Sequence, residues 1–74
     1  MPIVRVELLE GRSPETKAAL IRRLTEAIVD VLGSQPSQVR VLLHDVPPEN
    51  WGVGGQTMLD RRQTPTEPTG AAPT

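Results

Sequence analysis

The chain has no cysteine, a single histidine and a single aromatic side chain among its 74 residues. The lack of cysteine excludes disulfides and thiolate metal sites, and one histidine argues against a zinc site within one chain. No apolar run approaches the ~20 residues of a membrane-spanning helix. Eight basic and nine acidic residues give a net charge of −1, which argues against nucleic acid or an anionic membrane as a partner.

These absences leave a small chain that is expected to be cytoplasmic, because the segment after Met1 lacks the basic and apolar regions of a signal peptide. Seventy-four residues are enough for one domain, whose own hydrophobic core is marginal. Since neither disulfides nor a metal can stabilise it, self-association is the remaining source of stability.

Two segments show the alternation of half-buried strands, residues 3–9 and residues 38–45. In each, an apolar face alternates with a face that bears charged side chains. The apolar faces consist of Val4, Val6 and Leu8 in the first segment and Val39, Val41 and Leu43 in the second. Pro47 and Pro48 should end the second strand.

Between the two strands the sequence predicts one long helix. Ser13 is a suitable N-cap with Pro14 at the first helical position, and Gly33 is a suitable left-handed C-cap. Apolar residues recur between them at helical spacing. Strand, helix and strand form one α/β unit of βαβ type, so the strands should be parallel with a right-handed crossover.

The rest of the chain contains a glycine-rich segment, residues 50–55, that predicts a turn or short hairpin. From Gln63 the chain is rich in Pro and Thr and lacks apolar periodicity, which predicts a disordered tail over residues 63–74 after a domain of residues 1–62. A two-stranded sheet with one helix leaves both edges and one face exposed. We therefore expect a homo-oligomer.

Pro2 is the first candidate for chemistry. If Met1 is removed, as is usual before proline, the chain begins with a secondary amine that can act as base or nucleophile. An α-amino group titrates near ~8, and burial lowers its pKa. Pro2 shares the parity of Val4 and Val6, so a buried general base is one interpretation. The other is that Met-Pro only determines N-terminal processing.

Two arginines are candidates for binding an anion. Arg12 follows the first strand near the expected helix start, and Arg40 projects from the second strand opposite the apolar face. Guanidinium groups bind carboxylates in bidentate fashion, which suits a small dicarboxylate or keto acid. The alternatives are that Arg12 is a solvated loop residue and that Arg40 pairs with Glu7 on the adjacent strand.

Trp51 and His44 are weaker candidates. Trp51 lies in the glycine-rich segment, where it could form a pocket wall, an intersubunit contact or both. His44 faces outward near a strand end without a nearby second ligand or nucleophile, so a structural role is favoured.

In this order and spacing, Pro2 and residues 8–13 (LLEGRS), 39–41 (VRV) and 50–55 (NWGVGG) resemble the 4-oxalocrotonate tautomerase family. The resemblance covers the chain from Pro2 to about Arg62. It implies the βαβ tautomerase fold with a short C-terminal hairpin, assembled as a homohexamer that is a trimer of dimers. It also implies catalysis without cofactor or metal.

The resemblance further implies a role for each matching residue. Pro2 would be the catalytic base that moves a proton in an unsaturated keto acid. Arg12 would bind the distant carboxylate, and Arg40 the carboxylate and carbonyl end. Trp51, at a position where Phe or Tyr is more usual, would line the pocket, and Leu9 is placed with it among the substrate-binding residues. In the family these residues come from different subunits.

The family also contains hydrolytic dehalogenases, which carry an arginine and a glutamate where this chain has Leu9 and Val53. Neither side chain can activate water, so the resemblance favours tautomerisation of 2-hydroxydienoate-like or enol-pyruvate-like acids. The alternative function is a non-catalytic or weakly promiscuous subunit of a hetero-oligomer with this fold.

Overall fold

The computed structural model describes residues 1–63 of the chain. The chain divides into two compact units. Of the described residues, the first unit comprises 1–7 and 12–44, and the second comprises 8–11 and 45–63. None of the helices within residues 1–63 is long and apolar enough to cross a membrane.

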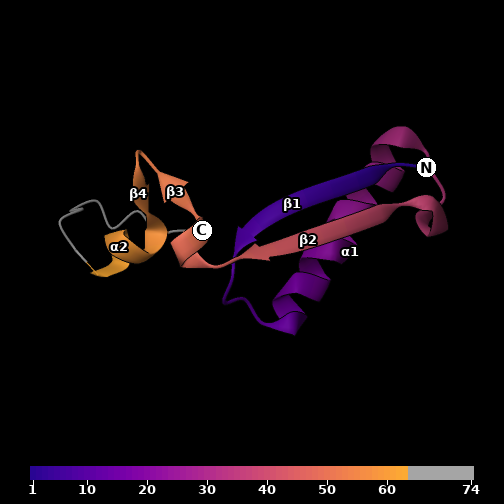
Figure 1. The fold of residues 1–74 in the computed structure, drawn as a ribbon. Coiled ribbons are helices and arrows are strands. Elements are labelled where there is room, and N and C mark those ends of the chain that lie inside the picture. The colour runs from indigo at the N-terminus through magenta and orange to yellow at the C-terminus, as the bar shows by residue number, and fades with distance from the viewer. Residues whose placement is uncertain (64–74) are drawn as a thin grey trace. The chain divides into compact units, whose positions relative to one another are not determined.

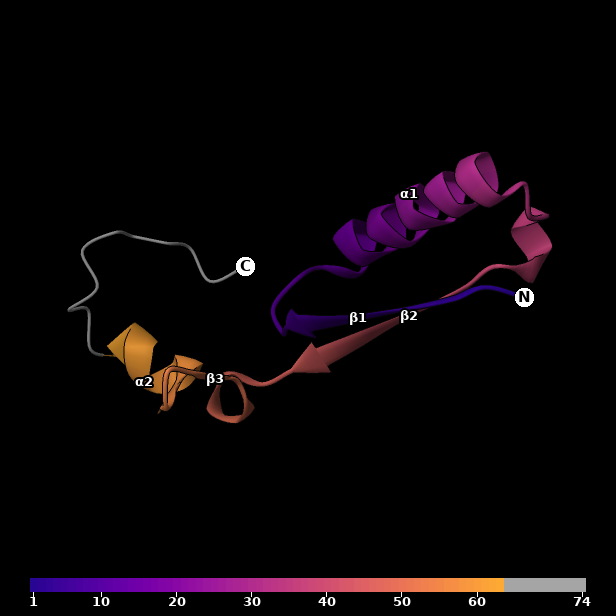
Figure 2. The same ribbon diagram turned by 90° about the horizontal axis from the view of Figure 1, so that it is seen from above.

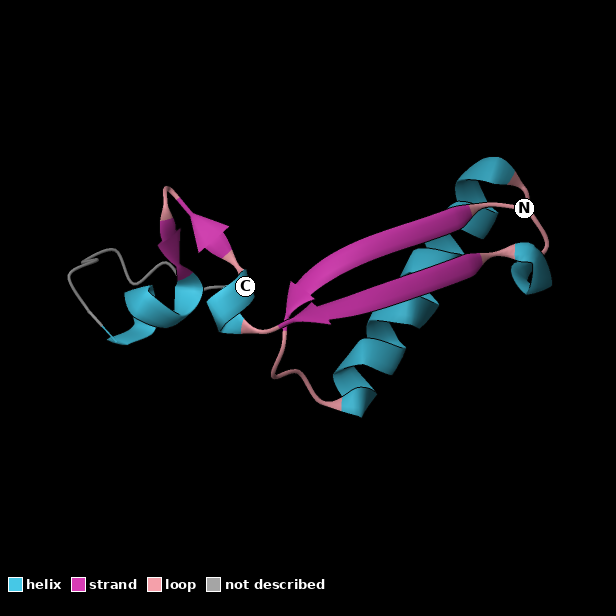
Figure 3. Cartoon of the chain, viewed as in Figure 1, coloured by secondary structure: helices cyan, strands magenta, loops and turns pink. Residues whose placement is uncertain are grey.

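Two strands and a long helix form the βαβ unit that the sequence predicts. The elements are β1 (Ile3–Leu9), α1 (Pro14–Leu32), the short 3-10 helix η1 (Pro36–Gln38) and β2 (Arg40–Val46). Figure 1 and Figure 3 show β1 and β2 side by side with their arrowheads at the same end, so the strands are parallel. Figure 2 shows α1 along one face of this two-stranded sheet.

The register of the sheet follows from the hydrogen bonds at its two ends. The amide of Arg40 donates to the Pro2 carbonyl at 3.0 Å, and the amide of Glu10 donates to the Val46 carbonyl at 3.0 Å. In a parallel ladder, both bonds belong to a single register without a bulge. The start of β1 therefore lies beside the start of β2.

Burial along the strands confirms the predicted faces. The alternating apolar residues Val4, Val6, Leu8, Val41 and Leu43 are half-buried. The intervening residues of both strands, from Ile3 to Glu7 and from Arg40 to His44, are exposed. Within residues 1–63, one sheet face therefore lacks cover.

The helix has the predicted caps. The Ser13 side chain accepts a hydrogen bond from the Thr16 amide at 3.1 Å, and Pro14 occupies the first turn. Gly33 has φ of 72° and donates its amide to the Val29 carbonyl at 2.9 Å. The left-handed conformation explains why glycine ends the helix.

The second strand begins later than the sequence predicts, at Arg40 rather than residue 38. Pro36 starts a 3-10 turn in which Gln38 donates to the Gln35 carbonyl and Val39 to the Pro36 carbonyl. Those two amides are therefore used by the turn and not by the sheet. The strand ends at Val46, one residue beyond the predicted end, and the two prolines follow it directly, as predicted.

The second unit contains the predicted hairpin and a helix that the sequence analysis did not predict. After η2 (Pro48–Asn50), the strands β3 (Gly52–Val53) and β4 (Gln56–Thr57) pair antiparallel. Gly54 and Gly55 join them with φ of 61° and 89°, the two positive angles of a tight hairpin turn.

The unpredicted helix is α2 (Met58–Gln63). Gln63, the first residue of the tail predicted to be disordered, is therefore the last residue of a helix. The remainder of that predicted tail, residues 64–74, lies outside the described residues.

The single chain buries little apolar surface. Among residues 1–63 the buried hydrophobic side chains are Leu9 and Val39, whereas Val31 is 78% exposed and Leu42 on the open sheet face is 50% exposed. Two buried side chains do not make a core that can offset the conformational entropy of folding. The structure thus supports the expectation of self-association.

Candidate active site

Pro2 and Arg40 lie together at the start of the sheet. The Arg40 amide donates to the Pro2 carbonyl at 3.0 Å, which fixes Pro2 immediately before β1. Pro2 is half-buried, whereas Met1 before it is 76% exposed. While Met1 is attached the Pro2 nitrogen is an amide nitrogen without basicity, and its removal leaves a secondary amine at this fixed position.

The Arg40 side chain points to the open face of the sheet. It is exposed, and its Nη1 donates to the Ser37 carbonyl in η1 at 2.8 Å. The sequence analysis left open that Arg40 pairs with Glu7, but Glu7 Oε1 lies 2.8 Å from His44 Nδ1. His44 is four residues beyond Arg40, or about 13 Å along the strand, so the register places His44 opposite Glu7.

His44 pairs with Glu7 across the two strands, which agrees with the structural role favoured by the sequence. Its side chain is 73% exposed and its partner Glu7 is 62% exposed. An exposed cross-strand pair of this kind contributes little, about 0–1 kcal/mol, to stability. Nothing in the described residues joins this pair to Pro2 or Arg40.

Arg12 lies at the opposite end of β1 from Pro2. The strand has seven residues, and at ~3.3 Å per residue it separates the two positions by about 23 Å. Arg12 is half-buried between β1 and α1 and has an interaction partner of its own. Within one chain, a small keto acid cannot touch both Pro2 and Arg12, so a site that uses both has to draw on more than one copy.

Trp51 and Leu9 belong to the second unit. The Trp51 carbonyl accepts from the Met58 amide at 2.7 Å, and Trp51 follows directly on η2, so its backbone is fixed between η2 and α2. Its side chain is half-buried. Leu9 is 1% exposed, the most buried hydrophobic residue described. Its place among the substrate-binding residues stays a prediction.

The structure also adds one contact that the sequence analysis missed, the Ser37 carbonyl on the Arg40 guanidinium. A main-chain carbonyl leaves no signal in residue identity. The spacing is the one signal that points to this contact. A proline that can start a short turn lies four residues before the arginine, so the carbonyls of that turn lie within reach of its side chain.

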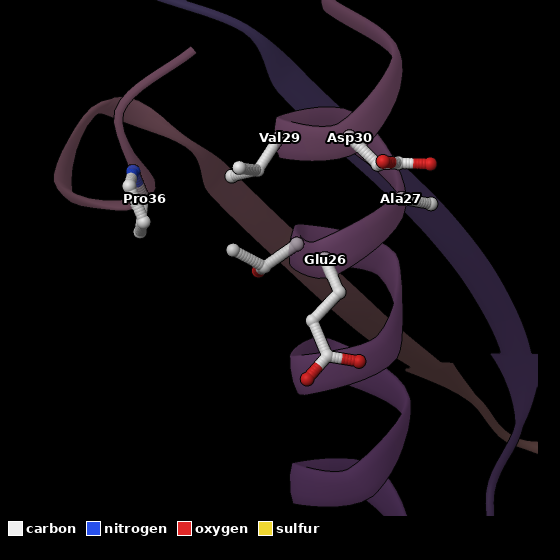
Figure 4. Close-up of a pocket in the computed structure, with 6 residues that line it drawn as sticks. Glu26, Ala27, Val29, Asp30 and Pro36 are labelled. Carbon is white, nitrogen blue, oxygen red and sulfur yellow. The ribbon is translucent and has the colours of Figure 1, made fainter. Parts of the chain in front are cut away.

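An open groove of about 600 Å³ lies elsewhere, between α1 and η1. Figure 4 shows Val29 and Pro36 facing each other across it, with the carboxylates of Glu26 and Asp30 directed away from Pro36. None of the candidate residues lines it, so the groove is not the candidate site. Its lining residues are Thr25, Glu26, Ala27, Val29, Asp30 and Pro36.

With this geometry in view, the comparisons with known proteins identify the family. The protein-family model described as "Tautomerase enzyme" matches residues 2–61. The chain is 49% identical over 55 residues to a 2-hydroxymuconate tautomerase of Comamonas testosteroni, a match that covers 74% of this chain and 87% of the relative.

Solved structures agree with this relationship. The crystal structure of TomN, a 4-oxalocrotonate tautomerase homologue of the tomaymycin biosynthetic pathway, superposes with a TM-score of 0.84 at 48% identity. That match covers 88% of this chain and all of TomN. A heterohexamer 4-oxalocrotonate tautomerase from Chloroflexus aurantiacus is 40% identical with a TM-score of 0.77, over 81% of this chain and 97% of that one.

The β-α-β unit with parallel strands and a C-terminal hairpin is thus a tautomerase fold. The chain belongs to the tautomerase family and is an isomerase.

Proposed function

We propose that this enzyme moves a proton in unsaturated 2-keto acids of the 2-hydroxymuconate type without a cofactor, and that the Pro2 amine is its general base. The observation that carries the proposal is the hydrogen bond that fixes Pro2 beside Arg40. This backbone contact supports the proposal because both residues lie at the same end of the two strands. The names of the 2-hydroxymuconate tautomerases among its relatives support the substrate class.

The reaction needs one group that exchanges a proton and others that hold charge. The amine accepts the proton of the 2-hydroxyl group of the dienol while the electrons of that O–H bond form the carbonyl. The conjugated double bond moves along the chain, and the ammonium returns the proton to the distal carbon. Arg40 binds the carboxylate and the carbonyl oxygen where negative charge develops, and Arg12 of another copy binds the remote carboxylate.

Trp51 completes the proposal as an apolar wall. An apolar side chain near the amine disfavours the ammonium form, and so do neighbouring guanidinium groups through like-charge repulsion. Both effects keep a larger fraction of the amine unprotonated and able to accept a proton. Leu9, which is buried in its own chain, has no step in the proposed reaction.

The direct test is an assay of a purified dienol. Protein whose intact mass shows that Met1 is absent should convert 2-hydroxymuconate to its keto form in buffer without added metal, followed by the loss of dienol absorbance. A chain of verified mass and assembly that leaves the rate at the buffer-catalysed level would contradict the proposal.

We further propose that the assembly is a homohexamer built as a trimer of dimers. The exposed sheet face and the separation of Pro2 from Arg12 both call for neighbouring copies. Sedimentation equilibrium at micromolar concentration should give a mass close to six times the 8.1 kDa of one chain. A folded protein with the mass of a single chain would refute assembly. A stable dimer or trimer would refute the hexamer.

A second candidate function is a subunit of a hetero-oligomer with little activity of its own. The observation that favours this second function is the similarity to a heterohexameric tautomerase from C. aurantiacus. The two candidates differ when the chain is produced alone, since a dedicated hetero-oligomer subunit should aggregate or remain small. Native mass spectrometry of the singly expressed chain distinguishes them.

A further inference from the structure

Arg40 donates hydrogen bonds from both its main chain and its side chain. Its amide donates to the Pro2 carbonyl at 3.0 Å, and its guanidinium Nη1 donates to the Ser37 carbonyl at 2.8 Å. The first contact belongs to the sheet ladder. The second contact is a local one between an exposed side chain and a carbonyl three positions earlier, so the fold does not require it.

We infer that η1 is a positioning element, in which the Ser37 carbonyl orients the Arg40 guanidinium for substrate. This inference rests on the function proposed above. It assigns to Pro36 and Ser37 a role in the reaction that they exert through Arg40, without contact to the substrate.

The acceptor carbonyl is held by a rigid turn. Pro36 fixes its own φ at the first position of η1. The amides of Gln38 and Val39 close the turn on the carbonyls of Gln35 and Pro36 at 2.9 and 3.2 Å. Val39, at the other end, is only 8% exposed. The Ser37 carbonyl therefore lies between a constrained proline and a core residue, and has little freedom to move.

The donor side has the geometry for two partners at once. A guanidinium group carries five N–H donors in one plane. When Nη1 donates to Ser37, the edge formed by Nε and Nη2 keeps the two parallel N–H bonds that bind a carboxylate. Lysine has a single ammonium group on a flexible stem and cannot hold both partners in fixed directions.

Anchoring one edge matters because an exposed arginine otherwise occupies many rotamers. Fixing such a side chain upon binding is entropically unfavourable, and misplacing a charge-binding group slows the chemical step. A guanidinium already held by η1 avoids both effects. The turn also adjoins the amide that fixes Pro2, so movement of η1 disturbs the base and the anion-binding group together.

The test compares two glycine substitutions in the same loop. Pro36→Gly frees the turn that holds Ser37, whereas Ser34→Gly adds backbone freedom just outside η1, by a smaller amount because serine lacks the ring of proline. In the assembled protein, Pro36→Gly should lower kcat/KM roughly tenfold and Ser34→Gly less than about twofold. Pro36→Ala, which retains the turn better than glycine, should recover part of the loss.

The Arg40→Ala background separates positioning from general loosening of the fold. If η1 acts through Arg40, Pro36→Gly should cause no further loss once the guanidinium is gone. A tenfold loss that persists in Arg40→Ala protein would overturn the inference, as would equal kinetics for Pro36→Gly and Ser34→Gly. Wild-type kinetics of Arg40→Ala alone would instead count against the proposed function.

Folding is monitored by circular dichroism and by the mass of the assembly. If Pro36→Gly does not assemble, Pro36→Ala is used for the same comparison with Ser34→Ala in both backgrounds. An Ala-for-Pro loss of roughly threefold that vanishes without Arg40 supports the inference, and an effect that is absent or independent of Arg40 overturns it.

Discussion

Protein that retains Met1 should assemble normally and lack tautomerase activity. In that chain the Pro2 nitrogen is part of a peptide bond, and its lone pair is delocalised into the Met1 carbonyl and cannot accept a proton. Met1 is 76% exposed in the folded chain, so its presence does not disturb the sheet. The bond from the Arg40 amide uses the Pro2 carbonyl rather than its nitrogen. The fold therefore tolerates both forms, and only the chemistry distinguishes them.

The experiment needs two preparations of the same sequence. One is processed to begin at Pro2, and the other carries a short N-terminal extension that aminopeptidases do not remove. Intact mass establishes each N-terminus, and sedimentation establishes that both have the same assembly. Turnover of the dienol should fall to the uncatalysed rate in the blocked form. Equal turnover in the two forms would remove Pro2 as the base.

Pro2→Ala, after Met1 removal, tests the kind of amine. Alanine leaves a primary amine with greater backbone freedom, so its nitrogen is held less well at the start of β1. We expect a large loss of proton transfer with the assembly preserved. A primary amine can also form a neutral Schiff base with a keto acid, so reduction with borohydride should trap a covalent adduct. Unchanged tautomerase kinetics would show that the ring of Pro2 is unimportant.

The sequence predicted those features of the fold that short-range chemistry determines. Ser13 and Gly33 bound α1 because a capping hydroxyl and a left-handed glycine act within one turn. Strand alternation identified the half-buried face of the sheet. The six-residue α2 was missed because so short a helix has a weak pattern and depends on its surroundings.

The candidate site was predictable as a set of residues but not as a geometry. Alternation placed Arg40 on the second strand and Pro2 directly before the first, yet only the parallel register shows that they meet at one end of the sheet. The length of β1 shows that Arg12 is remote from them. The partner of Arg40 was unpredictable because Ser37 contributes a carbonyl, and the burial of Leu9 depends on how the chain folds back on it.

Replacing each arginine by alanine should impair the enzyme in a different way. Arg40 is adjacent to Pro2, and in the proposed site its guanidinium faces the oxygen on which charge develops. An interaction that strengthens in the transition state affects kcat. Arg12 is about 23 Å from Pro2 in its own chain, and in the proposed site it acts from another copy on the part of the substrate that does not react. An interaction equal in ground and transition states affects KM.

The size of both effects follows from the loss of a charge-assisted, bidentate contact. Such a contact is worth on the order of 2–4 kcal/mol, or roughly thirty- to a thousandfold in rate or affinity. Arg40→Ala should show this loss in kcat, and Arg12→Ala should show it mainly in KM. A substrate without the remote carboxylate provides the control, because Arg12→Ala should then make little difference while Arg40→Ala stays impaired.

Mixing the two variants tests whether the site is shared between copies. If Arg12 acts on the Pro2 of another chain, co-assembled Arg12→Ala and Pro2→Ala chains should regain part of the wild-type activity. In such a mixture some sites combine an intact Pro2 from one chain with an intact Arg12 from another, provided that Arg40 is intact throughout. Each variant alone has no intact site. Mixed assemblies that show only the average of the two separate activities would mean that no site combines Pro2 and Arg12 from different chains.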